Sequence, residues 1–198
     1  MKKGVIILLG VLGVILLMIM WGMGKYNGLV KLDEGVNASW AQVQNQYQRR
    51  MDLIPNLVAT VQGVANFEKS TLTAVIEARA KATQVTLSPE LLKNPQAFHQ
   101  FEQSQGQLSS ALSRLLVTVE QYPNLKANEN FLQLQSQLEG TENRISVERK
   151  RFNETVQSYN ATIRTVPTSL IAGFGGFTQK SYFQAVAGAE TAPKVQFN

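Results

Sequence analysis

The sequence predicts an all-α fold in which an N-terminal transmembrane helix precedes an elongated, antiparallel, up-and-down bundle of four helices. Three observations support this prediction. The stretch Gly4–Gly24 is unbroken and apolar, apolar residues recur at seven-residue steps in segments between Leu29 and Val166, and prolines mark the breaks between segments. A repeat of 3.5 residues per turn is typical of helices that pack on helices, as in a coiled coil. We divide the chain into an anchor (1–24), a helical bundle (25–167) and an aromatic and glycine-containing C-terminal tail (168–198).

The stretch Gly4–Gly24 has the length of a membrane-spanning helix. At about 1.5 Å of rise per residue it covers roughly 31 Å, which matches the hydrocarbon core of a bilayer. A cleaved secretory signal also begins with basic residues and an apolar core, but such cores are shorter, about 7 to 15 residues, and end at small residues. Trp21 lies where an interfacial aromatic residue is expected. We expect the anchor to be retained, and cleavage at Gly22-Met23-Gly24 is the alternative.

The flanking charges define the orientation of the anchor weakly. Lys2 and Lys3 precede the apolar stretch, and Lys25 and Lys31 follow it. The positive-inside rule is therefore nearly balanced. Because the segment before the helix is short, and long domains are translocated largely regardless of their charge, we expect a cytoplasmic N-terminus and an exported domain.

Composition argues against several classes of site. The net charge is +5, but basic residues are scattered among acidic ones, so nucleic acid is not an expected partner. We interpret the basic run Arg149-Lys150-Arg151 as a solvated helix face, with anionic lipid as the less favoured contact. The chain has no cysteine and one histidine, His99, and this histidine with Glu102 does not make a metal site.

No residue set forms a recognisable reaction centre. Gly173–Phe177 lacks the spacing of a phosphate loop and follows no predicted strand, so a hinge or an aromatic docking segment is the better interpretation. No serine lies in a nucleophile motif. We therefore predict no catalytic, cofactor-binding or metal-binding residues, no cofactor and no small-molecule substrate.

Residues 26–86 form one continuous helical pattern. Pro55 interrupts it, because proline lacks the backbone N–H and its ring clashes with the preceding turn. Asp52 could cap a new helix there. The chain either kinks or reverses at Asp52–Pro55, or reverses later, at Gly63–Phe67, and the sequence leaves both open. Two seams run along this region: Leu29, Val36, Val43, Leu57 and Val64, and Trp40, Tyr47, Ile54, Val61 and Val75.

Two further helices are expected after a break at Ser88–Pro95, where Asn94 is placed as an N-cap. The seam of the first contains one polar residue, Gln105, and Pro123-Asn124 ends it; the second begins at about Lys126 and ends at Pro167. The first seam is Phe98, Phe101, Leu108, Leu112, Leu115, Val119 and Tyr122, and the second is Phe131, Leu138, Ile145, Phe152, Tyr159 and Val166.

The tail after Pro167 changes character. Its aromatic residues argue against complete disorder, and we expect it to dock on the bundle or on a neighbouring subunit. The aromatic–asparagine pairs Tyr26-Asn27, Phe152-Asn153 and Tyr159-Asn160 are too short to be a structural repeat.

Two charged residues, Arg50 and Glu68, fall on the seams and need partners. We favour a buried ion-pair network over an exposed seam that another subunit covers. If the first and last helices are antiparallel and begin level, paired residue numbers sum to about 192, because both helices have the same rise. Arg50 then faces Glu142, with Asp52 and Arg144 as alternates, and Gly140 would allow the helices to approach closely.

Several segments together resemble the LemA family: Tyr26–Val30, Arg49–Val58, Glu77–Ala80, Gly140–Ile145 and Val195–Phe197. The resemblance implies a bacterial single-span membrane protein with an antiparallel helical bundle and no established catalytic activity. Together with the orientation expected from the N-terminal segment, this leads us to expect the bacterial inner membrane as the location, with the soluble domain on the periplasmic side. One departure is Asn66-Phe67-Glu68, where relatives often have histidine before the glutamate.

The function expected from these features is a non-enzymatic scaffold in the lipid bilayer that associates laterally into a homo-oligomer. The alternative is an adaptor of another membrane protein, because LemA-like proteins are often encoded beside membrane metalloproteases of the HtpX type.

Overall fold

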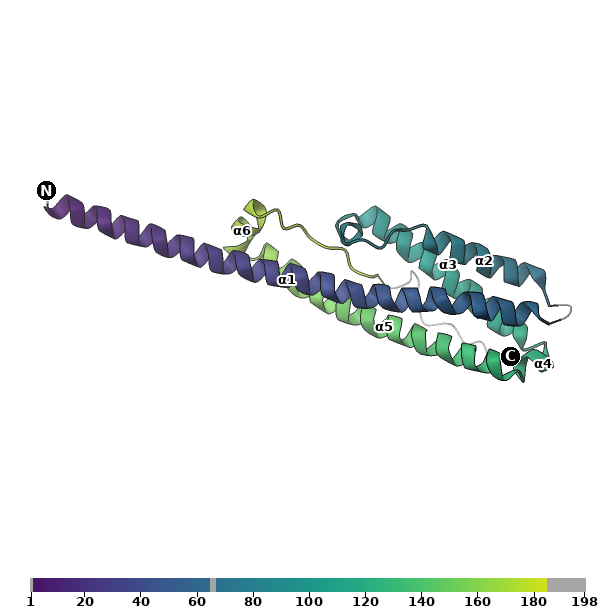
Figure 1. Cartoon of the computed structure of the whole chain (residues 1–198). Coiled ribbons are helices and arrows are strands. Elements are labelled where there is room, and N and C mark those ends of the chain that lie inside the picture. Colours follow the sequence, from purple (N-terminus) through teal and green to yellow (C-terminus); the bar gives the residue numbers. More distant parts are fainter. Residues whose placement is uncertain (1, 65–66, 185–198) are drawn as a thin grey trace, which may run out of the picture.

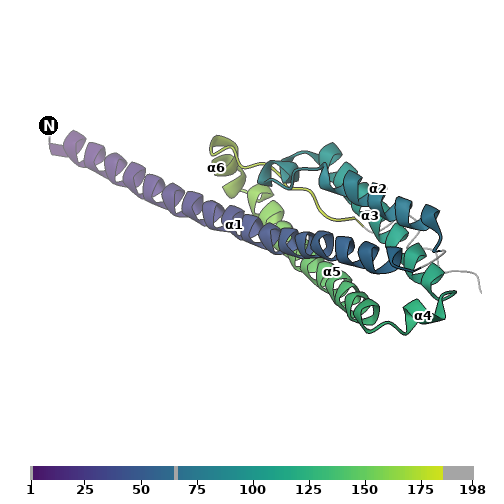
Figure 2. The same cartoon turned by 45° about the vertical axis from the view of Figure 1, so that its right-hand side comes forward.

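A computed structural model describes residues 2–64 and 67–184 of the chain (Figure 1). The described part is an elongated bundle of helices, from one end of which a single long helix projects (Figures 1 and 2). The elements are α1 (Lys2–Gln62), α2 (Lys69–Thr83), the 3-10 helix η1 (Pro89–Lys93), α3 (Pro95–Val119), α4 (Pro123–Lys126), α5 (Glu129–Arg164) and α6 (Thr168–Phe174). The predicted all-α architecture is confirmed. The segment Val195–Phe197, which the tail prediction includes, lies outside the described residues.

Helix α1 passes through Pro55 without ending there. Pro55 has no N–H to donate to the carbonyl of Met51, four residues earlier. The structure satisfies that carbonyl from another helix, because Arg79 Nε of α2 donates to Met51 O at 3.2 Å. The chain therefore reverses between Gln62 and Lys69, and the alternative reversal at Asp52–Pro55 is wrong.

The remaining helices run up and down beside α1, and asparagine caps start two of them. Asn94 accepts from Ala97 N at the start of α3, as predicted, and Asn128 accepts from Phe131 N at the start of α5. Two predicted boundaries need correction. Helix α3 ends at Val119, and Pro123 begins the short helix α4 instead of closing α3, because proline suits the first turn of a helix. The last long helix begins at Glu129 and not at about Lys126, which belongs to α4.

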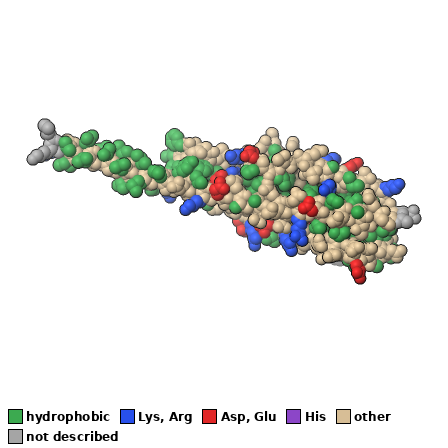
Figure 3. All heavy atoms as spheres, in the orientation of Figure 1, with side chains coloured by type: hydrophobic (Ala, Val, Ile, Leu, Met, Phe, Trp, Pro, Cys, Tyr) green, Lys and Arg blue, Asp and Glu red, His purple; other side chains and the backbone are tan. Residues whose placement is uncertain are grey.

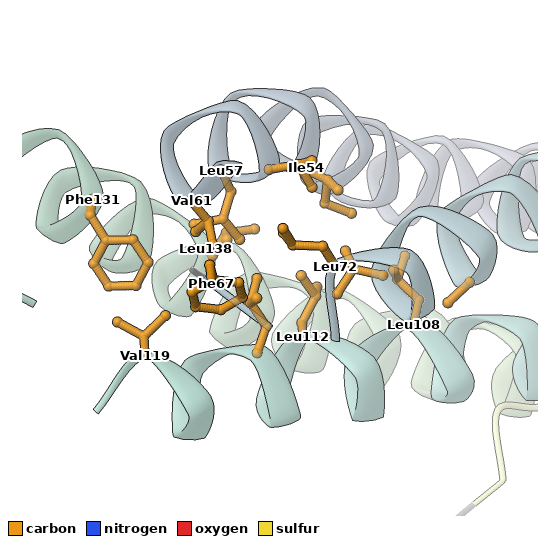
Figure 4. Packing of buried hydrophobic residues seen from close by; sticks show 14 of the residues in the cluster. Ile54, Leu57, Val61, Phe67, Leu72, Leu108, Leu112, Val119, Phe131 and Leu138 are labelled. Carbon is orange, nitrogen blue, oxygen red and sulfur yellow. The ribbon is translucent and has the colours of Figure 1, made fainter. Parts of the chain in front are cut away.

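The bundle contains two hydrophobic clusters, one in each half. We call the half farther from the projecting helix the distal half, and part of its packing is shown in Figure 4. Its buried residues are Met51, Ile54, Leu57, Val58, Val61, Phe67, Leu72, Val75, Ala78, Ala82, Leu108, Leu112, Leu115, Val119, Leu125, Phe131 and Leu138. The other half, the proximal half, buries Leu29, Val36, Trp40, Val43, Tyr47, Leu91, Leu92, Phe98, Phe101, Ile145, Phe152, Val156, Tyr159, Ile163, Ala172 and Phe183.

The two halves have different walls because α2 is much shorter than α5. Where α2 has ended, η1 and the extended segment 177–184 take its place, joined by a hydrogen bond from Ser181 N to Leu92 O of 2.9 Å. A tight turn leads from α6 into this segment. Gly176 has a positive φ of 71°, and a Cβ at Gly175 would lie 2.7 Å from the Phe177 ring, so both positions favour glycine.

The projecting part of α1 is apolar and exposed over its whole length (Figure 3). It is the one helix among the described residues that is long and apolar enough to cross a membrane. The chain is thus a helical protein with one N-terminal anchoring helix, and that helix continues without a break into the bundle.

Candidate functional site

A buried arginine lies where the two halves of the bundle meet. Arg50 of α1 is 1% exposed. Its Nη1 donates to Glu142 Oε1 of α5 at 2.7 Å and to Ser109 Oγ of α3 at 2.9 Å, and its Nη2 donates to Gln105 Oε1. The predicted pair of Arg50 with Glu142 is confirmed. Charge and helical rise were enough to predict this pair from the sequence. The partner Gln105 stood out only as the one polar residue of its seam, and nothing in the sequence linked it to Arg50.

Other parts of that prediction need correction. A Cβ at Gly140 would have no neighbour within 4 Å, so this glycine does not serve a close approach of α1 and α5. Glu68 is exposed and accepts from the Ser70 hydroxyl, so the seam buries no carboxylate there. Asp52 accepts from Gln48 within α1, and Arg144 is exposed. The buried network thus joins one arginine to neutral groups and to a glutamate that is 41% exposed.

A cavity of about 910 Å³ opens beside this network. Residues that line it include Tyr47, Arg50, His99, Glu102, Glu142 and Arg149. Burial raises the pKa of the Tyr47 hydroxyl, and this effect exceeds the opposing influence of Arg149 and Arg50. Tyr47 therefore stays protonated at neutral pH. The cavity offers both signs of charge and several amides, which suits contact with a polar segment of a protein.

The extended segment 177–184 is bound along α5 through its backbone. Asn160 donates to Lys180 O and accepts from Lys180 N, and Asn153 does the same for Phe183, with all four distances 2.9 Å. Seven residues of helix rise about 10.5 Å, and three residues of extended chain span about 10 Å. The distance between Asn153 and Asn160 along α5 therefore matches the distance between Phe183 and Lys180 along the extended segment. The signal in the sequence was the aromatic–asparagine pair that recurs seven residues apart.

Two side chains of the segment add specific contacts. The Phe183 ring lies 5.0 Å from Phe98 and 5.5 Å from Phe152, measured between ring centroids, and Arg149 lies over it at 4.4 Å. Lys180 is buried and its Nζ lies 2.9 Å from Asp33 Oδ1. The prediction of a solvated face at 149–151 is thus wrong for Arg149, because the ring of Phe183 and the Gln184 carbonyl attract its guanidinium.

Tyr159 of α5 also binds the backbone of the segment 177–184. Its hydroxyl donates to Thr178 O at 3.0 Å. Burial, followed by the nearby Asp33 carboxylate, raises the pKa of Tyr159 above its ordinary value, because both disfavour a phenolate. The hydroxyl therefore remains a hydrogen-bond donor over the physiological pH range.

The two sequence features considered for chemistry, His99 and Gly173–Phe177, lie in separate elements. His99 is exposed and contacts Gln103 at 3.2 Å between the two Nε2 atoms. In residues 2–64 and 67–184, no three His, Asp or Glu side chains approach closely enough to hold a metal ion. Gly173–Phe177 forms the end of α6 and the turn after it, and Phe177 packs edge-on against Tyr26, with ring centroids 5.6 Å apart.

Sequence comparisons identify related proteins. The profile of the LemA family matches residues 39–197. Magnetosome protein MamQ of Magnetospirillum gryphiswaldense is 25% identical over 183 residues, which cover 84% of this chain and 67% of the relative. Magnetosome protein MamQ 2 of Paramagnetospirillum magneticum matches to the same extent. Protein LemA of Metamycoplasma hominis is 25% identical over 166 residues, covering 82% of this chain and 70% of the relative.

Proposed function

Because this chain belongs to the LemA family, we propose that it is a non-enzymatic, membrane-anchored scaffold whose bundles associate side by side into a homo-oligomeric assembly at the membrane surface. The names of the relatives describe a family or the magnetosome, and none of these names states an enzymatic activity.

The observation that carries this proposal is the continuity of α1. One helix contains both the apolar stretch and the first wall of the bundle, with no linker between them. The part of α1 beyond the anchor is roughly 55 Å long at about 1.5 Å per residue. A bundle joined in this way stands on the membrane as a rod with a defined axis, and this is the geometry that lateral packing of identical copies needs.

Membrane attachment also lowers the strength of contact that assembly requires. Exposed apolar side chains lie on the outer surfaces of three helices, and each alone is ordinary for a protein surface. Copies held in one membrane share an orientation and a high effective concentration, so weak side-by-side contacts can suffice. These side chains are Ile76, Val117, Leu132 and Val147.

Continuity of α1 also favours retention of the anchor over signal cleavage. Cleavage at Gly22-Met23-Gly24 would cut within an unbroken helix. We propose a single pass through the bacterial inner membrane, with the bundle on the periplasmic side. Intact-mass analysis of the membrane fraction tests retention, and a protein that begins after Gly22 or Gly24 would refute it.

Mass photometry of the full chain, extracted in detergent, tests the scaffold. The expected result is a discrete assembly of many copies. A chain that is monomeric and alone would contradict the proposal. A monomer that co-purifies with a second membrane protein would support the adaptor function instead.

The adaptor function has one specific observation in its favour, which is the open cavity beside Arg50. A polar segment of a partner could enter it and contact Glu102, Glu142 or Arg149 without any change in the bundle. A membrane metalloprotease of the HtpX type is the partner proposed for this alternative. Cross-linking from a photoreactive group placed at Gln103, on the cavity wall, would identify such a partner.

A further inference from the structure

The region around α6 exposes large apolar side chains to an unusual degree. Val166 is 83% exposed, Leu170 is 65% exposed and Phe174 is 96% exposed. These residues recur every four positions, and Thr168 and Ala172 of the same segment are buried against the bundle. The helix Thr168–Phe174 contains no charged residue. One side of this short element is therefore fixed to the protein while the other presents apolar side chains outward.

The position of α6 suggests what covers this surface. It lies beside α1 at the end of the bundle from which the apolar helix projects (Figures 1 and 2). The turn that follows α6 lies against Tyr26. The Phe177 ring packs edge-on against it, and a Cβ added at Gly175 would lie 3.1 Å from Tyr26 Cε2. Tyr26 comes two residues after Gly24, the last residue of the apolar stretch. The exposed side chains of α6 thus lie close to the level at which α1 leaves the bilayer.

Resting on the membrane anchor described above, we propose that Val166, Leu170 and Phe174 insert into the adjacent lipid interface and form a second membrane contact. Their apolar surface continues that of the anchor, with apolar side chains gathered at this end of the bundle (Figure 3). Trp21 and Lys25, with Arg164 at the end of α5, provide the aromatic and basic residues that favour an interface. A lipid surface needs no shape complementarity, which suits three separate side chains better than a protein partner does.

A second contact has a mechanical consequence. The tilt of a single helix in a bilayer is set by its neighbours and by interfacial residues. A second point of insertion beside the helix restricts this tilt. Every copy would then hold its bundle at a similar angle to the membrane, which favours the lateral association proposed above.

The absence of cysteine from the sequence allows a direct test in the full chain. Single variants Leu170→Cys and Phe174→Cys are labelled with the fluorophore NBD and reconstituted in phosphatidylcholine vesicles with or without nitroxide-labelled lipid. Val117→Cys is the matched control, because Val117 is 69% exposed, about as much as Leu170, but lies near the far end of α3. Leu16→Cys reports insertion of the anchor. All four side chains are exposed, so the substitutions leave the packed core unchanged.

Loss of emission with nitroxide lipid at positions 16, 170 and 174, with unchanged emission at 117, supports the proposal. Quenching at 16 without quenching at 170 and 174 overturns it and leaves the anchor intact. A blue-shifted but unquenched signal at 170 or 174 indicates a protein neighbour and also overturns it. If position 16 is not quenched, the anchor itself is wrong, and this inference fails with the proposed function on which it rests.

Discussion

The two halves of the bundle bury similar numbers of residues but are built differently. Among the described residues, two of the seventeen in the distal cluster are aromatic, Phe67 and Phe131, and the cluster is formed mainly by α1, α2, α3 and α5. In the proximal cluster seven of sixteen are aromatic, and one of them, Phe183, comes from an extended segment. The distal half is thus a helical bundle of the ordinary kind, whereas the proximal half needs a non-helical element to close it.

The difference follows from the unequal lengths of the helices. After α2 ends at Thr83, a stretch of the proximal core would face solvent without a wall. The Gln44 side chain holds the connecting loop by donating to Leu87 O, and the two asparagines of α5 hold the segment 177–184. Large rings fill the wider space that remains. Helices alone suffice where four run together. Where only three do, η1 and the segment 177–184 take the place of the fourth, and side-chain amides hold the segment and the loop before η1 in position.

Removal of Phe183 should produce the largest effect and should be specific to the proximal half. The Phe183→Ala variant should lose about 3 to 5 kcal/mol of unfolding free energy, because a buried phenyl ring leaves a cavity. Phe183 lies 6.0 Å from Trp40 between ring centroids. We therefore expect the Trp40 emission to shift to longer wavelength, measured in a Trp21→Phe background, since the chain has two tryptophans.

The matched control is Phe131→Ala, since Phe131 is 2% exposed and lies in the distal cluster. It should destabilise the protein by a similar amount, yet leave the Trp40 emission of the folded protein unchanged. If both variants shift the emission equally, the two halves are one cooperative core and the comparison fails.

Loss of one backbone clamp should have the next largest effect. In Asn160→Ala the N–H and C=O of Lys180 lose their partners in a buried site, which should cost about 1 to 3 kcal/mol. In this variant, hydrogen exchange measured by mass spectrometry should become faster in 177–184 than it is in the unchanged protein, while exchange in α2 should change less. Asn143→Ala, at an exposed position of α5, controls for helix propensity and should leave that exchange unaltered.

Substitutions of Arg50 and Glu142 test the interactions at the boundary between the two halves. Replacement of Arg50 by Met leaves the buried Gln105 without its donor, and this should cost about 1 to 3 kcal/mol. Glu142→Gln should cost less than about 1 kcal/mol, because the Glu142 side chain is 41% exposed and solvent screens its attraction to Arg50. Urea unfolding of both variants decides the point, and equal losses would show that the ion pair, not the buried amide, dominates.

The sequence predicts the distal half better than the proximal half, and the reason is physical. Seven-residue steps of apolar residues report helix packing, and equal helical rise places Arg50 opposite Glu142 without knowledge of any contact. The continuity of α1 through Pro55 could not be inferred, because it depends on Arg79, which is distant in sequence. The recurring aromatic–asparagine pair marks Asn153 and Asn160, but it could not reveal which segment they bind, since their partners are backbone groups that every residue has.

Substitution of a glycine in each half of the bundle should change stability in opposite directions, and the effect should be smallest at Gly140. A Cβ there meets no atom within 4 Å and the residue lies inside α5, so Gly140→Ala should stabilise the protein by about 0.5 to 1 kcal/mol through helix propensity alone. In a protein of this size, each kcal/mol of added stability raises the unfolding temperature by about 2 to 4 °C. Gly175→Ala should destabilise it, because its Cβ would lie 2.7 Å from the Phe177 ring and 3.1 Å from Tyr26. Thermal unfolding of both variants by circular dichroism measures the contrast. A destabilised Gly140→Ala variant would show that α1 and α5 approach more closely at this level than the structure has them.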